Sequence, residues 1–94
     1  MFKHAGEAET LVKLLANRNR LMVLCSLHDG EMSVGELNDC VPLSQSALSQ
    51  HLAILRSAGI VATRREAQVI YYRLADERAT TVIDTLYRLF CATD

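Results

Sequence analysis

The sequence has few of the residues that mark several large classes of protein. Its 94 residues include one proline, four glycines, three cysteines and no tryptophan. So little glycine and proline excludes a collagen-like or linker-like chain, and the odd, small number of cysteines excludes a disulfide framework. No apolar run approaches the roughly 18 residues that span a bilayer, so we expect no membrane partner. The length allows one domain, spanning 1–94.

The sequence also lacks an excess of one sign of charge, because its formal net charge is only −1. Apolar residues make up 50% of the chain and charged residues 22%, which excludes disorder. The N-terminus lacks the apolar core of a signal peptide, so we expect a cytoplasmic protein. Near-neutrality argues at first against nucleic acid. However, residues 44–75 contain four arginines and one glutamate, which is 4 − 1 = +3 and leaves −1 − 3 = −4 elsewhere.

Apolar spacing and capping residues predict the order helix, helix, short helix, helix, strand, strand, helix. A capping box from Ser33 to Glu36 opens the short helix, and Ser44 and Asp76 cap later ones. This order is that of a winged helix-turn-helix, a mainly α (α+β) fold. The predicted elements are helices over 7–17, 18–28, a short stretch between Ser33 and Pro42, 45–58 and 77–91, and strands over 60–66 and 69–74. The helix-turn-helix covers about 33–58 and the wing about 60–74.

The fourth helix has one buried stripe and one small, polar, almost uncharged face. On a helical wheel, Leu48, Leu52 and Leu55 define the stripe, and His51 lies at its edge as a packing residue or phosphate contact. Small hydroxyls and amides suit a major groove, and arginines on a hairpin suit phosphate. A plain surface helix and a solubilising arginine pair are the alternatives. The candidate DNA-binding residues are Ser44, Gln45, Ser46, Ser49, Gln50, His51, Arg56, Arg64, Arg65 and Gln68.

Nothing in the sequence favours an enzyme or a cofactor. There is no glycine-rich phosphate loop and no C-x-x-C, and Ser49 and His51 point to different sides of one helix. The three histidines, His4, His28 and His51, fall in separate segments, without the spacing of a zinc site. We therefore expect no metal site.

Several stretches of the sequence together form a recognisable pattern: Ser33-Val34-Gly35-Glu36-Leu37, Leu43 to Leu52, Leu55-Arg56, Gly59, Thr63 to Gln68, the LCSL around Cys25, and Arg88-Leu89-Phe90-Cys91. With them, the sequence resembles the ArsR/SmtB family of bacterial winged-helix repressors over about residues 7–92. It is most similar to the thiol-sensing, HlyU/BigR/SqrR-like branch. The resemblance implies a homodimer, paired through the first and last helices, that binds imperfectly palindromic double-stranded promoter DNA.

Cys25 and Cys91 lie 66 positions apart and have two interpretations. Free cysteine is among the most buried residue types, so both could simply fill the core. The resemblance instead implies a redox-sensing pair, joined by a disulfide or a sulfur bridge when a small oxidant or sulfur species reacts. From spacing, His28 and Arg88 are the cations expected to support thiolates at Cys25 and Cys91.

Two alternatives stay open. Metal-responsive relatives use a C-x-C pair in the third helix, where this chain has Asn38 and Cys40, or Asp and His on the last helix, where it has Asp84 alone. In the thiol-sensing interpretation, Cys40 is a bystander on the short third helix. A winged-helix module that binds protein and not DNA is the other alternative.

Overall fold

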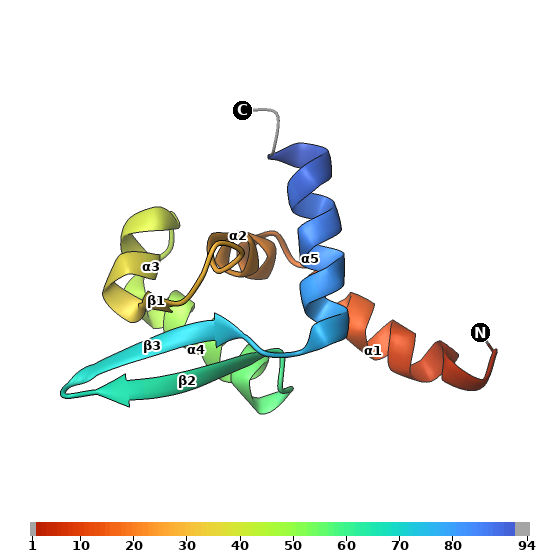
Figure 1. Cartoon of the computed structure of the whole chain (residues 1–94), viewed down its shortest axis with the longest axis horizontal. Helices are drawn as coiled ribbons and strands as arrows, with labels where there is room; N and C mark the ends of the chain where they lie inside the picture. Colours follow the sequence, from red (N-terminus) through yellow and green to blue (C-terminus); the bar gives the residue numbers. More distant parts are fainter. Residues whose placement is uncertain (1, 92–94) are drawn as a thin grey trace.

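The computed structural model describes residues 2–91, and its elements follow the predicted order (Figure 1). A short 3-10 turn, η1 (Phe2–His4), precedes the first helix. The elements are α1 (Ala5–Leu15), α2 (Arg18–Ser26), β1 (Met32–Ser33), α3 (Val34–Cys40), α4 (Gln45–Ser57), β2 (Val61–Glu66), β3 (Val69–Leu74) and α5 (Glu77–Phe90). Within the described part of the chain, no helix is long and apolar enough to cross a membrane.

The predicted helix caps are confirmed. The Ser33 hydroxyl accepts from the Glu36 N–H at 3.1 Å, and the Glu36 carboxylate accepts from the Ser33 N–H at 2.9 Å, which completes the capping box. The Ser44 side chain accepts from the Ala47 N–H and caps α4, and the Asp76 side chain accepts from the Ala79 N–H and caps α5. These caps fix the entry of α4 and α5, the two helices that carry most candidate site residues.

The first two helices differ from the prediction by two residues, and α4 and α5 each end one residue earlier than predicted. α1 covers Ala5–Leu15 and not 7–17, because the Asn17 side chain accepts from two backbone N–H groups of the next turn and caps α2. α2 ends at Ser26 and not at 28. The chain then turns at Gly30, whose φ of +143° favours glycine.

The hairpin is part of a three-stranded antiparallel sheet of order β1-β3-β2. β1 pairs Met32 with Tyr72, and the sequence prediction missed it because two residues carry no alternating pattern. Glu66 pairs with Val69, so only two residues form the turn. Ala67 takes a φ of +55°, which a two-residue turn requires and which is uncommon outside glycine.

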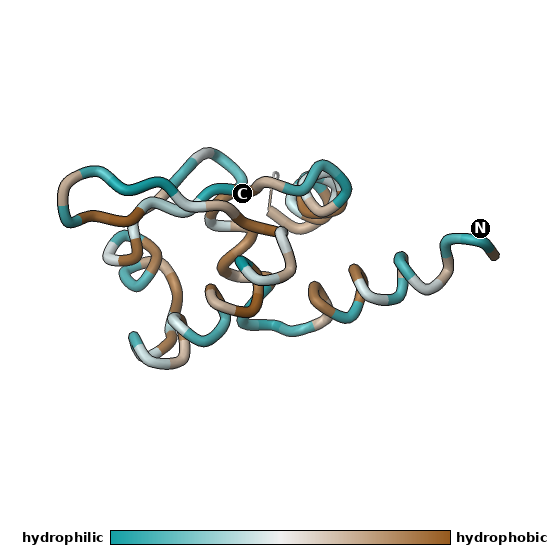
Figure 2. Tube along the Cα trace, turned by 90° about the horizontal axis from the view of Figure 1, so that it is seen from below, coloured by the Kyte–Doolittle hydropathy of each residue, from teal (hydrophilic) through white to brown (hydrophobic). Residues whose placement is uncertain are grey.

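The core forms where α2, α4 and α5 meet the base of the sheet, and the predicted stripe Leu48, Leu52 and Leu55 is fully buried. α2 lies in the middle of the molecule (Figure 1). By contrast, α1 projects from the rest of the chain (Figure 2) and buries only Leu15.

Candidate DNA interface and cysteine groove

The polar face of α4 is exposed as the helical wheel predicts. Gln45, Ser46, Ser49 and Gln50 are exposed and lie in its first two turns. We call these four residues the reading face. The first turn contains no acidic side chain, so the positive end of the helix dipole is not neutralised there. Ser44 is exposed too, with its oxygen engaged as the helix cap.

His51 and Arg56 border this face. His51 is half-buried, in agreement with its predicted place at the edge of the stripe, and its shielded Nδ1 has no hydrogen-bond partner among the described residues. Arg56 is exposed and, with Ser49, lines a groove of about 500 Å³ that reaches Tyr72 of β3. The reading face and the wing are therefore neighbours across one groove.

Arg64 of the wing is held by other residues of the chain. Its Nε lies 2.9 Å from Glu31, which precedes β1, and its Nη1 lies 2.9 Å from Glu66. Its guanidinium also stands 4.4 Å from the ring centre of Tyr71 on the middle strand. The pKa of the Glu31 carboxyl is held below its ordinary value, chiefly by these hydrogen bonds. Arg64 is thus a brace across all three strands.

Arg65 is different, although it is adjacent in sequence. Its Nε donates to the Ala67 carbonyl at 3.1 Å at the tip of the hairpin, and it forms no ion pair with the described residues. Gln68 is exposed at the same turn. The sequence prediction treats the two arginines as equivalent, because the partner of Arg64 is 33 residues away.

Cys25 and Cys91 line one groove between α2 and α5. This cysteine groove is open, with a volume of about 590 Å³, and almost wholly apolar. Both cysteines are half-buried and free, whereas Cys40 is exposed on α3. The cysteine groove is lined by Ala16, Asn17, Arg18, Leu21, Met22, Cys25, Leu86, Phe90 and Cys91.

The apolar lining makes ionisation of Cys25 difficult. Burial raises the pKa of the Cys25 thiol, and the neighbouring Cys91 raises it further. Two thiolates in one groove repel each other, so the protonated form of Cys25 is favoured at neutral pH. The prediction that His28 and Arg88 stabilise thiolates at Cys25 and Cys91 is wrong, because both side chains bind Asp84.

Those cations form a cluster on the same seam between α2 and α5. His28 Nε2 lies 2.9 Å from Asp84, and its ring stacks on Tyr87 with centroids 4.0 Å apart and planes 8° apart. Arg88 reaches the second Asp84 oxygen at 2.6 Å. We call these four residues the His28 clamp. Sequence reasoning missed it, because His28 and Asp84 are 56 positions apart and neither belongs to a motif.

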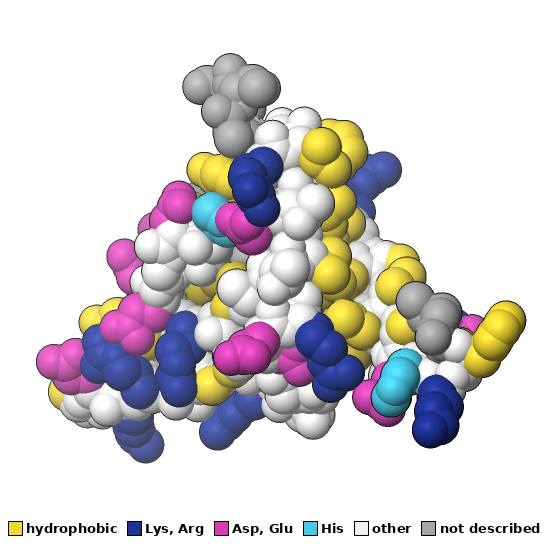
Figure 3. Space-filling model, turned by 45° about the vertical axis from the view of Figure 1, so that its right-hand side comes forward, with side chains coloured by type: hydrophobic (Ala, Val, Ile, Leu, Met, Phe, Trp, Pro, Cys, Tyr) yellow, Lys and Arg dark blue, Asp and Glu magenta, His cyan; other side chains and the backbone are white. Residues whose placement is uncertain are grey.

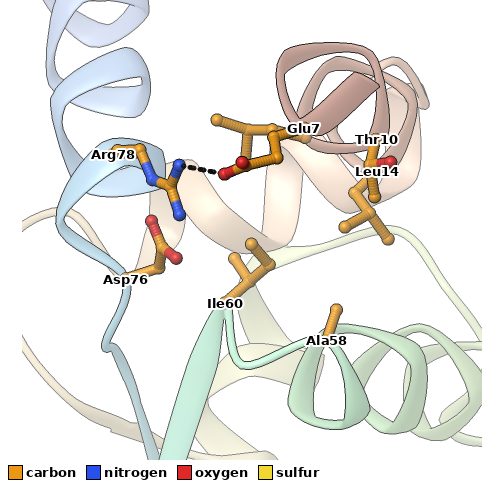
Figure 4. Close-up of a pocket in the computed structure, with 8 residues that line it drawn as sticks. Glu7, Thr10, Leu14, Ala58, Ile60, Asp76 and Arg78 are labelled. Atoms are coloured by element: carbon orange, nitrogen blue, oxygen red, sulfur yellow. Dashed lines mark hydrogen bonds and ion pairs between the residues drawn. The ribbon is translucent and has the colours of Figure 1, made fainter. Parts of the chain in front are cut away.

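Two further observations concern the other polar side chains of residues 2–91. No group of three His, Cys, Asp or Glu side chains within residues 2–91 is placed to hold a metal ion. A smaller cavity of about 250 Å³ lies between α1 and the starts of β2 and α5 (Figure 4). Its charged groups are already engaged, since Arg78 pairs with Glu7 at 3.2 Å and Asp76 caps α5.

The chain is similar to several known regulators. It is 50% identical over 91 residues to the transcriptional activator HlyU of Vibrio cholerae, covering 97% of this chain and 84% of that protein. It is 52% identical over 92 residues to the biofilm growth-associated repressor of Agrobacterium fabrum, covering 98% and 79%. These relatives are regulators of transcription, in agreement with the prediction that the chain is not an enzyme.

The fold gives the same answer. The structure of reduced HlyU superposes with a TM-score of 0.92, covering 97% of this chain and 96% of the other. The transcriptional repressor BigR of Xylella fastidiosa superposes with a TM-score of 0.89 at 46% identity, covering 98% and 94%. Residues 17–63 match the bacterial regulatory protein, arsR family, model. The predicted winged helix-turn-helix and the predicted similarity to HlyU and BigR are therefore confirmed, and the chain belongs to the ArsR family of bacterial transcriptional regulators.

Proposed function

We propose that the protein is a homodimeric repressor whose binding to promoter DNA is controlled by the oxidation or persulfidation of Cys25 and Cys91. The observation that carries the proposal is that two cysteines 66 positions apart line the same apolar groove. That groove lies on the joint between α2, in the middle of the fold, and α5. A bond across it would change how α5 sits on the rest of the chain.

The DNA half of the proposal rests on α4 and the wing. The reading face combines amides and hydroxyls, groups that can pair with base edges in the major groove, and Arg56 and Arg65 are exposed cations that can bind phosphate. Ser44 and Gln68 border this surface, and His51 has a shielded ring nitrogen without a partner. Arg64 contributes by keeping the wing in shape, and it contacts DNA only by exchanging a carboxylate for a phosphate.

The dimer half rests on the apolar surfaces of α1 and α5. Phe2 is fully exposed, and Val12, Leu89 and Phe90 are 61%, 67% and 73% exposed. Figure 3 shows hydrophobic side chains along the flank of α5 and towards α1. Contiguous apolar surface of this kind marks an interaction site. A second copy of the chain, paired through the same two helices, would cover it and would place two reading faces on one palindromic site.

The chemistry of the switch balances as follows. With a hydroperoxide, the two thiols lose two electrons and two protons to become a disulfide, and the hydroperoxide becomes an alcohol and water. With a low-molecular-weight persulfide, one cysteine takes the outer sulfur and releases a thiol. The other cysteine then attacks that protein persulfide, forms the disulfide and releases hydrogen sulfide. HlyU, one of the similar structures, is described in a reduced form.

The test begins with DNA that the reduced protein selects from a random duplex library. Binding of that duplex is then measured for the reduced and the oxidised protein, and for Cys25→Ser and Cys91→Ser variants, with Cys40→Ser as the matched control. We expect oxidation to weaken the binding of wild type and Cys40→Ser about 5- to 150-fold, and to leave the other two unchanged. Equal affinity of the reduced and oxidised forms would contradict the thiol switch. Failure to select any duplex would favour a winged-helix module that binds protein.

A metal-responsive repressor is the second outcome to examine. It predicts that zinc or arsenite binds at one ion per subunit and changes the affinity for the selected duplex. The same titration in the Cys25→Ser and Cys40→Ser variants shows whether the ion binds in the cysteine groove or at Cys40 on α3. An unchanged affinity with either ion favours the thiol switch.

A further inference from the structure

The His28 clamp and the cysteine pair follow one another along the same helix–helix seam. His28 comes three residues after Cys25, in the turn that follows α2. Asp84 and Tyr87 lie on α5, seven and four residues before Cys91, the residue that caps this helix, so the three follow one side of it. The seam between α2 and α5 therefore has two neighbouring parts. The His28 clamp joins the two sides in one part, and the two thiols line the groove in the other.

We propose that His28 is a positioning residue for the thiol switch: by holding Asp84 and Tyr87, it keeps Cys91 of α5 beside Cys25 of α2. This inference rests on the proposed function and adds residues that share no motif with the cysteines. Cys91 is the residue that caps α5 at its C-terminal end, directly after Phe90. The last turn of a helix frays unless a side chain restrains it, and here Tyr87 and Arg88 supply that restraint through His28 and Asp84.

The clamp and the disulfide should stabilise each other. A bond between the cysteines ties α5 to α2, so the clamp then forms at a lower entropic cost. By reciprocity, a formed clamp raises the effective concentration of one thiol at the other by the same factor. Losing the clamp should therefore make the disulfide easier to reduce.

Protonation of His28 adjusts the strength of this contact. Hydrogen bonds to Asp84 and then to Asp29 raise the pKa of His28 above its ordinary value. The other charged groups around it are Arg88 on α5, and Glu31 and Arg73, which line the same shallow pocket. The imidazolium, which binds Asp84 most strongly, is present below about pH 6.5 and is lost as the pH rises through the raised pKa. The disulfide should be hardest to reduce at the acidic end of this range.

The experiment measures the equilibrium between the full-length protein and glutathione. Two protein thiols and one oxidised glutathione give the Cys25–Cys91 disulfide and two reduced glutathiones, and no proton is released while all thiols are protonated. Below about pH 7.5 the cysteines therefore contribute little pH dependence. All proteins carry Cys40→Ser to prevent crosslinks between copies, and the disulfide fraction is read by mass spectrometry from pH 5.5 to 7.5.

The Cys40→Ser protein with no other substitution has the wild-type clamp. For this protein, we expect the effective concentration of one thiol at the other to fall about two- to fivefold from pH 5.5 to 7.5. Asp84→Asn should start lower at pH 5.5 and stay flat. His28→Gln keeps a donor but cannot be protonated, so it should be flat and intermediate. Asp29→Asn is the matched control, because it removes a carboxylate from His28 without touching α5, and it should keep a falling profile.

The outcomes separate the two proposals. If the wild-type clamp forms the disulfide but its profile is flat, or if Asp84→Asn matches it at every pH, the clamp has no positioning role and the cysteine switch stands. A higher effective concentration in Asp84→Asn also overturns the inference, because it means that clamp and disulfide compete. If no Cys25–Cys91 disulfide forms at any glutathione ratio, the proposed function falls and the clamp role falls with it.

Discussion

The reading face of α4 and the seam between α2 and α5 hold their side chains in different ways. The reading face depends on one helix, whose buried leucines and Ser44 cap aim four polar residues outward. The seam depends on pairs drawn from opposite ends of the chain, Cys25 with Cys91 and His28 with Asp84. A local surface can change one residue at a time without disturbing the fold. A seam couples its residues, which is what a switch requires.

Ile83→Ala should have the largest effect, on the seam side of the comparison. Ile83 is fully buried where α5 packs on the core, so its truncation should lower the free energy of unfolding by about 2–5 kcal/mol. Val82→Ala is the matched control, because the neighbouring side chain is 37% exposed. Urea unfolding of both variants measures the difference. Equal losses would mean that α5 is not packed as described.

Gln50→Ala should separate binding from stability on the α4 side. Gln50 is exposed and makes no hydrogen bond with another side chain in the described residues, so urea unfolding should be unchanged. Binding to the selected duplex should weaken by about 1–3 kcal/mol if the amide reads a base. Ser57→Ala, at the far end of α4, is the control and should bind normally. Binding of Gln50→Ala equal to wild type would remove Gln50 from the reading face.

Sequence reasoning recovered the features that depend on neighbours in the chain. Ser33 and Glu36 lie three residues apart, and Leu48, Leu52 and Leu55 repeat at helical spacing, so caps and buried stripe could be derived without coordinates. β1 was missed because two residues carry no period. Its pairing with β3 depends on the turn after α2, which no local pattern specifies.

The same limit explains what was missed at the candidate site. A histidine that binds a carboxylate 56 positions away leaves no local signal, so His28 looked like support for Cys25. Likewise, Arg64 and Arg65 look alike in sequence, and only Glu31, beside β1, distinguishes them. The pair of Arg88 with Asp84 is different, because their i,i+4 spacing on one helix is a local signal that could have identified it in place of support for Cys91.

Substitutions at Arg65 and at Glu31 test whether DNA binding by the wing depends only on exposed side chains or also on the contact between Arg64 and Glu31. Arg65→Ala should weaken binding and reduce the salt slope by about one, because it removes one phosphate contact. Glu31→Gln should strengthen binding by up to about fivefold, since it frees Arg64 and removes a negative charge. Anisotropy titrations at several salt concentrations measure both. Weaker binding by Glu31→Gln would show that the brace is needed to shape the wing.

The smallest expected effect is the pH dependence of the clamp's contribution to stability. The pKa of Asp84 is lowered, chiefly by its hydrogen bond to His28, so its contribution is present above about pH 3.9 and lost as the pH falls through the lowered value. The raised pKa of His28 makes its contribution complete below about pH 6.5 and lost as the pH rises. The Tm difference between wild type and Asp84→Asn should therefore be greatest between about pH 4 and 6.5 and should shrink towards pH 8. Asp29→Asn, which leaves α5 untouched, should show a smaller difference. A Tm difference that grows towards pH 8 would mean that the neutral imidazole, and not the imidazolium, holds Asp84 at the seam.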